Sequence, residues 1–285
     1  MKSMRKQLLG SVFIALLVLV GCKQPVHYGG VPRKAFFKSI VSLSPSTTEM
    51  VGLAGIMLIG RTQACNYPLS MSSVPVVADL KPDYEKITQI HPDLILLDRD
   101  LYGDSEIQKL KETKAVIKVV GSDTVEGYIK DFYTLGNLIS GEANINEYII
   151  RVRKQITASQ GDKPAKELKA AFIIPDASGH HMIAGSKSFQ ADVVRIIGAT
   201  PVGPDSNKFE MLNPEFLMTQ NPDFIFIAGV EKGFLADTRF ANLRAVKAKN
   251  ILSLDQDIAL RKGSRVDEFI YLGHKHLMLA LEVKK

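Results

Sequence analysis

The chain has 285 residues, of which 46% are hydrophobic and 23% charged, enough for one large domain or two modest ones. Three of its 36 basic residues and none of its 30 acidic residues lie in residues 1–21, so the remainder carries 33 basic against 30 acidic residues, a net charge of +3. These proportions exclude a disordered chain and a multi-span membrane protein, and the small net charge without a Lys/Arg cluster excludes a nucleic-acid-binding protein.

The N-terminus has the order of a secretory signal. Three basic residues precede an uncharged apolar run, Leu8 to Val20, which is too short to span a bilayer comfortably. The run closes on Leu-Val-Gly-Cys, which is similar to the bacterial lipobox, so we expect residues 1–21 to be a lipoprotein signal peptide and Cys22 to be lipidated. The lipid would hold the protein outside the cytoplasm, at the cell membrane or in the periplasm. The alternative is an ordinary secretory signal with an incidental Cys.

Residues 22–37 contain Pro, Gly and polar residues and are typical of a tether. The next segment alternates apolar strands with helical stretches, which predicts parallel pairing and an N-terminal α/β lobe over residues 38–141. With Cys22 used for the anchor, Cys65 has no disulfide partner. The expected strands of this lobe are Ser39–Leu43, Ile56–Gly60, Asp93–Leu97 and Ala115–Val120.

A long helical pattern over residues 142–161 predicts a linking helix, after which the alternation restarts. Residues 162–285 therefore form a second, C-terminal α/β lobe. Its expected elements are a strand at Ala170–Ile174, a helix at Ser188–Ile197, a strand at Phe224–Ala228 and a final helix at about Val266–Val283.

The second half of the chain repeats a sequence pattern of the first half. DYEKITQIHPDLILL (83–97) aligns without a gap to NPEFLMTQNPDFIFI (213–227), 130 residues later. Each copy has Asp or Asn at a helix N-cap, a Glu two residues later, and Pro-Asp before an apolar strand. Two such copies predict two lobes of related plan, with the linking helix as the strut between them.

Ligands of open α/β sheets bind at the carboxyl ends of the strands, and this rule selects loop residues of both lobes. For each of them the alternative is a residue that caps a helix or faces solvent. Aromatic faces suit a flat macrocycle, and they could be supplied by Tyr67, Tyr102, Phe189 and Phe209. We expect ligand contacts from Ser44, Pro45, Ser46, Cys65, Asn66, Tyr67, Tyr102, Asp176, His180, His181, Phe209 and Arg261.

The pair His180–His181 is the sharpest local feature. A neutral imidazole is the commonest metal-ligating side chain, and either His could be the axial ligand of a haem iron or a corrinoid cobalt. A solvated polar loop is the alternative. We expect no metal site made by the protein alone, and Cys65 is interpreted as a small, partly buried thiol. His274 and His276 are predicted to lie on a helix surface.

Catalytic motifs are lacking. The sequence has no G-x-S-x-G elbow and no H-E-x-x-H, and GHHMIAGSKS (179–188) lacks the Gly-Lys-Ser/Thr ending of a phosphate loop. We therefore expect no catalytic residues, with an extracytoplasmic hydrolase as a remote alternative.

The ordered motifs resemble the periplasmic cobalamin- and siderophore-binding proteins (class III) of ABC importers. VSLSPSTTEMVGLAG, GRTQACNYP and VPVVADLKPDYEKITQIHPDLILL are similar to the N-terminal lobe of that family, and GSKSFQADVVRIIGA and LNPEFLMTQNPDFIFIAG to its C-terminal lobe. The resemblance covers roughly residues 38–280. It implies two doubly wound, Rossmann-like lobes joined by one long rigid helix, with a ligand cleft between them. It also implies a monomeric substrate-binding protein, not an enzyme and without a cofactor, that delivers a bulky metal chelate to a permease dimer driven by a separate cytoplasmic ATPase.

Two finer expectations follow from the resemblance. The motif SPSTTE and a Tyr-Pro after the second expected strand are most similar to cobalamin binders and favour a corrinoid ligand. The chain has no Trp, a residue common in the clefts of such proteins. A ferric siderophore or haem is the alternative. In this family a Glu on each lobe meets Arg residues of the two permease subunits, which implies docking roles for Glu85 and Glu215. Stabilisation of the helix macrodipole is the competing explanation for both residues.

Overall fold

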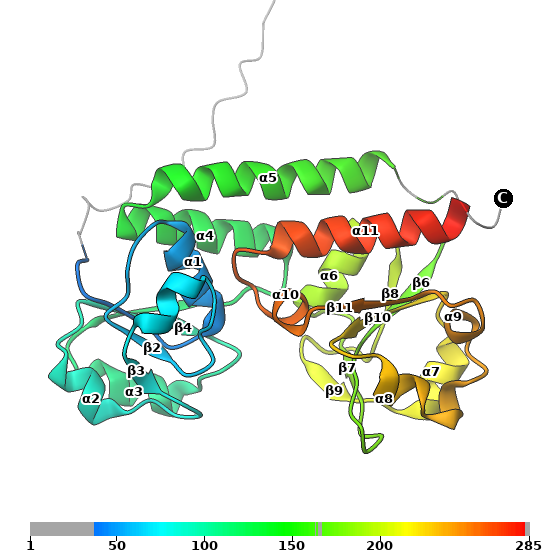
Figure 1. The fold of residues 1–285 in the computed structure, drawn as a ribbon, viewed down its shortest axis with the longest axis horizontal. Helices are drawn as coiled ribbons and strands as arrows, with labels where there is room; N and C mark the ends of the chain where they lie inside the picture. Colours follow the sequence, from blue (N-terminus) through cyan, green and yellow to red (C-terminus); the bar gives the residue numbers. More distant parts are fainter. Residues whose placement is uncertain (1–36, 163, 165–166, 283–285) are drawn as a thin grey trace, which may run out of the picture. The chain divides into compact units, whose positions relative to one another are not determined.

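The computed structural model describes residues 37–162, 164 and 167–282, and Figure 1 shows their arrangement. The expected signal peptide, Cys22 and the tether as far as residue 36 lie outside the described residues. The described chain forms two α/β lobes, each with its own sheet, as predicted. None of its helices is both long and apolar enough to cross a membrane.

The N-terminal lobe has a five-stranded, wholly parallel sheet in the order β3-β2-β1-β4-β5. The chain winds outward on one side of β1 and then returns to wind outward on the other, which places the topological switch point between β1 and β4. Its elements are β1 (Ile40–Ser42), α1 (Pro45–Leu53), β2 (Gly60–Thr62), a 3-10 turn (Leu69–Ser73), β3 (Val76–Ala78), α2 (Tyr84–Gln89), β4 (Leu94–Asp98), α3 (Asp104–Lys111), β5 (Val116–Val120) and α4 (Val125–Ile139).

The second strand differs from the prediction. The apolar run 56–59 leads from α1 into the sheet without strand geometry, and β2 begins only at Gly60, which lies opposite Val41 of β1. Leu58 is buried in the core, so its apolar character reflects packing of the connection. The prediction also missed β3, a strand of three residues that is too short to give an alternating pattern.

The C-terminal lobe has six strands in the order β11-β10-β6-β7-β9, with β8 beside β6. Parallel pairing holds for β6, β8, β10 and β11, but β7 and β9 pair antiparallel. The loop between β6 and β7 is too short for a crossover helix, which enforces the antiparallel return. The elements are β6 (Lys169–Ile174), β7 (Met182–Ala184), α6 (Phe189–Ile196), β8 (Thr200–Val202), β9 (Phe209–Met211), α7 (Pro214–Gln220), β10 (Phe224–Ala228), α8 (Lys232–Leu235), a 3-10 turn (Thr238–Phe240), α9 (Arg244–Lys247), β11 (Ile251–Leu254), α10 (Gln256–Leu260) and α11 (Val266–Glu282).

The predicted linking helix is α5 (Glu142–Gly161), which packs along α4 of one lobe and α11 of the other (Figure 1). Ile145, Tyr148 and Val152 form its buried stripe. The Tyr148 hydroxyl lies 2.8 Å from that of Tyr128 and accepts from the backbone N–H of Val266, at 3.0 Å. One buried pair of tyrosines therefore ties α4 and α5 to the start of α11.

Two histidines of α11 are more buried than the surface position expected for them. His274 and His276 of α11 are both half-buried. His276 packs edge-on against Phe224 of β10, and burial lowers its pKa. Helix α11 covers the C-terminal sheet, so side chains on two adjacent faces of this helix are partly buried.

Candidate ligand-binding site

A cavity of about 640 Å³ is lined by residues of both lobes. Its volume falls in the usual range for small-molecule sites. Arg99 and Asp100 follow β4, and Ile174 ends β6, so the cavity lies at the carboxyl ends of strands, where the topology predicts a ligand site. The remaining lining residues belong to the C-terminal lobe and are Phe189, Gln190, Asn207, Lys208, Phe209, Leu260 and Lys262.

One part of the lining is apolar. Phe209 packs edge-to-face against the buried Phe172, with ring centroids 5.9 Å apart, so its ring is held in place. Phe189 is buried at the start of α6, and the ammonium of Lys262 lies 5.7 Å from its ring centroid. Together with Ile174 and Leu260 these rings offer faces against which a planar macrocycle can pack.

The other part of the lining is charged and joins the lobes. Lys262 Nζ lies 2.5 Å from Asp100 Oδ2, and only 9% of the Lys262 side chain is exposed. The Asn207 amide donates to Asp123 Oδ2 at 2.9 Å, and Asp123 also pairs with Arg99 at 2.9 Å. Two polar contacts therefore cross from the N-terminal to the C-terminal lobe at the cavity.

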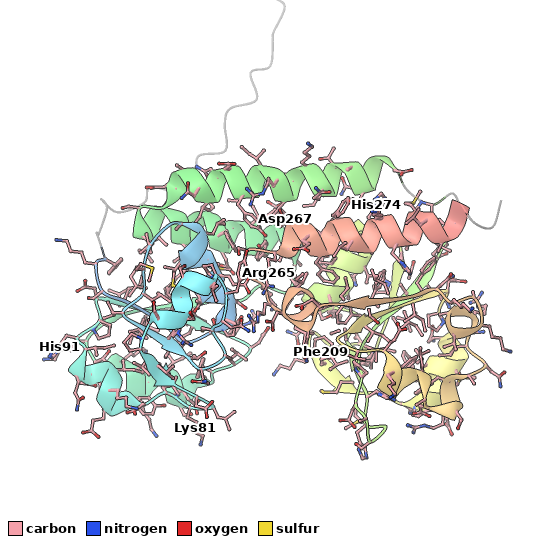
Figure 2. The ribbon with its side chains drawn as sticks, viewed as in Figure 1. Lys81, His91, Phe209, Arg265, Asp267 and His274 are labelled. Carbon is pink, nitrogen blue, oxygen red and sulfur yellow. The ribbon has the colours of Figure 1, made fainter. Side chains whose placement is uncertain are left out.

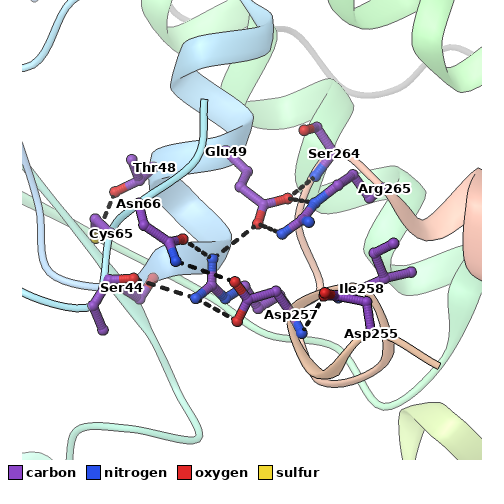
Figure 3. A network of polar contacts seen from close by, with 12 residues as sticks. Ser44, Thr48, Glu49, Cys65, Asn66, Asp255, Asp257, Ile258, Ser264 and Arg265 are labelled. Carbon is purple, nitrogen blue, oxygen red and sulfur yellow. Dashed lines mark hydrogen bonds and ion pairs between the residues drawn. The ribbon is translucent and has the colours of Figure 1, made fainter. Parts of the chain in front are cut away.

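Beside the cavity, a buried carboxylate fixes the segment before α11 to the N-terminal lobe (Figure 3). Glu49 of α1 is 1% exposed and accepts from the Arg265 guanidinium at 2.6 Å and from the backbone N–H of Ser264 at 3.0 Å. Arg261 lies 3.5 Å from the same carboxylate. Glu49 was not among the expected site residues, although a Glu within an otherwise uncharged helix, SPSTTEMVGL, is a signal for a buried ion pair.

Arg261 and Asn66, both expected at the ligand, meet in this network. Arg261 donates to Asn66 Oδ1 at 2.6 Å and pairs with Asp257 at 2.6 Å. The Arg265 guanidinium carbon lies over the ring of Tyr67, 4.4 Å from the centroid of that ring. These side chains join the two lobes and are not part of the cavity lining.

Several expected site residues lie in the interior of the N-terminal lobe. Ser44 is fully buried as the N-cap of α1, where its side chain accepts from the Thr47 N–H, with Pro45 in the first turn and Ser46 buried after it. The buried Cys65 thiol accepts from the Thr48 hydroxyl at 2.9 Å. Tyr102 is half-buried, and burial raises its pKa to about 12.

The loop with the paired histidines packs against the 3-10 turn that follows α8. His181 is 1% exposed; the backbone N–H of Asp176 donates to its Nδ1, which places the proton of the neutral ring on Nε2. Nε2 lies 3.3 Å from Asp237 Oδ2 without hydrogen-bond geometry. His180 is exposed, and the Ser178 hydroxyl, which bonds to its ring, also holds the pKa of Asp176 below the ordinary value.

Neither histidine lines the cavity, so their placement gives no support to an axial metal ligand. Among the described residues no group of three or more His, Cys, Asp or Glu is arranged to hold a metal ion. Of the aromatic side chains expected to face the ligand, Phe189 and Phe209 line the cavity, and Tyr67 and Tyr102 do not.

Glu85 and Glu215 occupy the expected matching positions. Each is exposed in the first turn of a helix, α2 or α7, behind an N-cap side chain from Asp83 or Asn213. Neither carboxylate has a cation within ion-pair distance in the described part of the chain.

Comparison with known proteins gives matches over most of the chain. A family model described as "Periplasmic binding protein" matches residues 40–258. The ABC transporter substrate-binding lipoprotein YvrC of Bacillus subtilis is 24% identical over 81% of this chain and 77% of its own. The vitamin B12-binding protein of Salmonella typhimurium is 24% identical over 79% of this chain and 81% of its own. The solved structure of the periplasmic haem-binding protein BhuT superposes with a TM-score of 0.75 at 19% identity, covering 86% of this chain and 99% of BhuT.

Proposed function

Because this chain belongs to the periplasmic binding protein family and is a substrate-binding protein of an ABC transporter, we propose that it captures a corrinoid in the cavity between its lobes. It acts outside the cytoplasm, in transport and not as an enzyme, and it carries no cofactor of its own. It then delivers the bound ligand to a permease dimer with its cytoplasmic ATPase.

The observation that carries this proposal is a cavity built by both lobes at the carboxyl ends of β4 and β6. Its aromatic and aliphatic faces suit a large, flat ring system. A corrinoid is favoured because the relatives include vitamin B12-binding proteins. Haem is the second candidate, because a haem-binding protein has the same fold. A ferric siderophore, which the sequence also left open, has only the charged part of the lining in its favour.

Docking is the second part of the proposal. Glu85 and Glu215 are exposed, unpaired within the described residues, and carried at equivalent positions on two lobes that α5 holds together. Charge-assisted Arg–carboxylate contacts supply both orientation and encounter rate. We assign this pair to contacts with Arg residues of the two permease subunits.

The test is transport by the permease–ATPase complex of the source organism, reconstituted in liposomes with wild-type protein or the double variant Glu85→Ala, Glu215→Ala. The variant should bind ligand as wild type does but fail to support transport, and each single change should give a partial loss. The matched control is Glu126→Ala, Glu268→Ala, which removes two exposed first-turn glutamates from α4 and α11. Wild-type transport with the first variant would leave only the helix-dipole role for the pair.

A further inference from the structure

We propose that the cavity recognises its ligand through an anionic group seated between Lys262 and Lys208, and that this charge, not a bond from the protein to the metal, selects among chelates. The inference rests on the proposed function, because it concerns the same cavity.

Lys262 is a buried cation with hydrogen-bonding capacity left over. Its side chain is 9% exposed, and an ammonium group has three N–H donors. Among the described residues its ammonium has one hydrogen-bond partner, Asp100 of the opposite lobe, at 2.5 Å. Since a buried charge is costly unless its hydrogen bonds are satisfied, an acceptor supplied by the ligand would complete this group.

Lys208 supplies a second cation to the same lining. It is exposed, and no carboxylate of the described residues lies within ion-pair distance of its ammonium. Arg99, by contrast, is already paired with Asp123, at 2.9 Å. Among the described residues, three cations therefore line the cavity against one lining carboxylate, Asp100, and two of the cations retain capacity for an anion.

The described residues of the lining offer the metal no imidazole, sulfur or phenolate donor, because they include no His, Cys, Met or Tyr. The one lining carboxylate, Asp100, is already paired with Lys262. The apolar part of the lining is formed by phenylalanine, leucine and isoleucine side chains, which pack against a ring but do not coordinate. A chelate whose metal already has a full set of ligands fits this composition, and it would be oriented by the charge at its edge.

The anionic group can come from two sources. A complete cobalamin carries a phosphodiester in its nucleotide loop, which cobinamide lacks. A ferric tris-catecholate is anionic, whereas ferrioxamine B is cationic. Lysine binds phosphate and other oxyanions as a point charge, so both anionic chelates present the same chemistry to the two lysines.

The experiment is calorimetric titration of the full-length protein with these four compounds: cyanocobalamin, dicyanocobinamide, a ferric tris-catecholate and ferrioxamine B. In each pair that binds, the member that carries the anionic group, cyanocobalamin or the ferric tris-catecholate, should bind at least about tenfold more tightly, equivalent to ~1.4 kcal/mol. Raising the salt concentration should reduce this preference. The pair that shows it identifies the source of the anion.

Substitution of the lysines separates charge from shape. The preference should fall in Lys208→Gln and disappear in Lys208→Gln, Lys262→Gln. The double variant is also made with Asp100→Asn, because Asp100 pairs with Lys262 and would otherwise be left as an unpaired carboxylate. Lys187→Gln is the control, because Lys187 is an exposed lysine of the same lobe that pairs with Asp205 and does not line the cavity.

Equal affinity for both members of a binding pair, or a preference unchanged in the lysine variants, would overturn the inference and leave the proposed function intact. Binding of none of the four compounds would overturn capture of a corrinoid or siderophore itself, and the inference with it.

Discussion

Replacing Glu49 with Gln should destabilise the protein, because it removes a buried charge that two arginines face. The substitution keeps the shape of the side chain but removes its charge at a position that is 1% exposed. The side-chain oxygen can still accept from the Ser264 N–H, so the loss falls on two guanidinium groups, those of Arg261 and Arg265. Both lie in the segment of the C-terminal lobe that is fixed to α1.

The magnitude follows from the burial of the two arginines. Removing one partner of a buried ion pair costs about 3–5 kcal/mol, because the other charge stays buried without compensation. Arg261 retains Asp257 at 2.6 Å, and the two arginine side chains remain 14% and 16% exposed, so water solvates part of the orphaned charge. We therefore expect the free energy of unfolding to fall by about 2–3 kcal/mol, below the fully buried case.

The assay is urea unfolding at pH 7, monitored by circular dichroism. Glu147→Gln serves as the matched control, because Glu147 is 77% exposed and lies 3.9 Å from Arg151, and it should change stability by less than about 0.5 kcal/mol. A double-mutant cycle of Glu49→Gln with Arg265→Gln should give a coupling energy of at least about 1 kcal/mol. A loss for Glu49→Gln no larger than that of the control would refute the reasoning.

Three further predictions concern single residues. Gly263→Ala would place a Cβ 2.3 Å from the Glu49 carboxylate, so it should lower the free energy of unfolding by about 1–3 kcal/mol in the same assay; an unchanged midpoint would contradict the packing. Asp237→Asn should destabilise fully above about pH 4 and progressively less towards pH 2, because a hydrogen bond from Arg239 lowers the pKa of Asp237 from 3.8 to about 2 and the stabilisation is lost as the carboxyl protonates; a pH-independent difference in urea midpoints would contradict this. Cys22→Ser should abolish lipid labelling and release the protein from membranes, and unchanged membrane association would exclude the anchor.

The plan of the fold could be predicted because its signals are local. The linking helix was recognised from its periodicity, and the repeated N-caps at Asp83 and Asn213, each followed by an exposed Glu, identified equivalent helices. Strand positions were less accurate, because the apolar run 56–59 is buried without being a strand. Periodicity reports burial and does not distinguish a buried connection from a buried strand.

The site was predicted less well than the fold, for a physical reason. Loops at the carboxyl ends of strands are candidates in both lobes, but the packing of the lobes decides which of them face one another. Lys262 and Asp100 are 162 residues apart in the sequence, and their contact exists only in the assembled pair of lobes. His181, which suggested a metal ligand from its place in the sequence, is buried against Phe234 and Phe240, a contact that the sequence does not reveal.

Titration of cyanocobalamin into the protein tests the central claim most directly, with wild type compared against a variant whose cavity is filled. Leu260→Trp adds bulk to the lining, and Leu279→Trp, at a position 49% exposed on α11, controls for the substitution itself. We predict saturable one-to-one binding to wild type and to Leu279→Trp, and affinity at least about tenfold lower for a folded Leu260→Trp. Absence of binding to wild type, or equal binding to all three proteins, would contradict capture of a corrinoid in the cavity between the lobes.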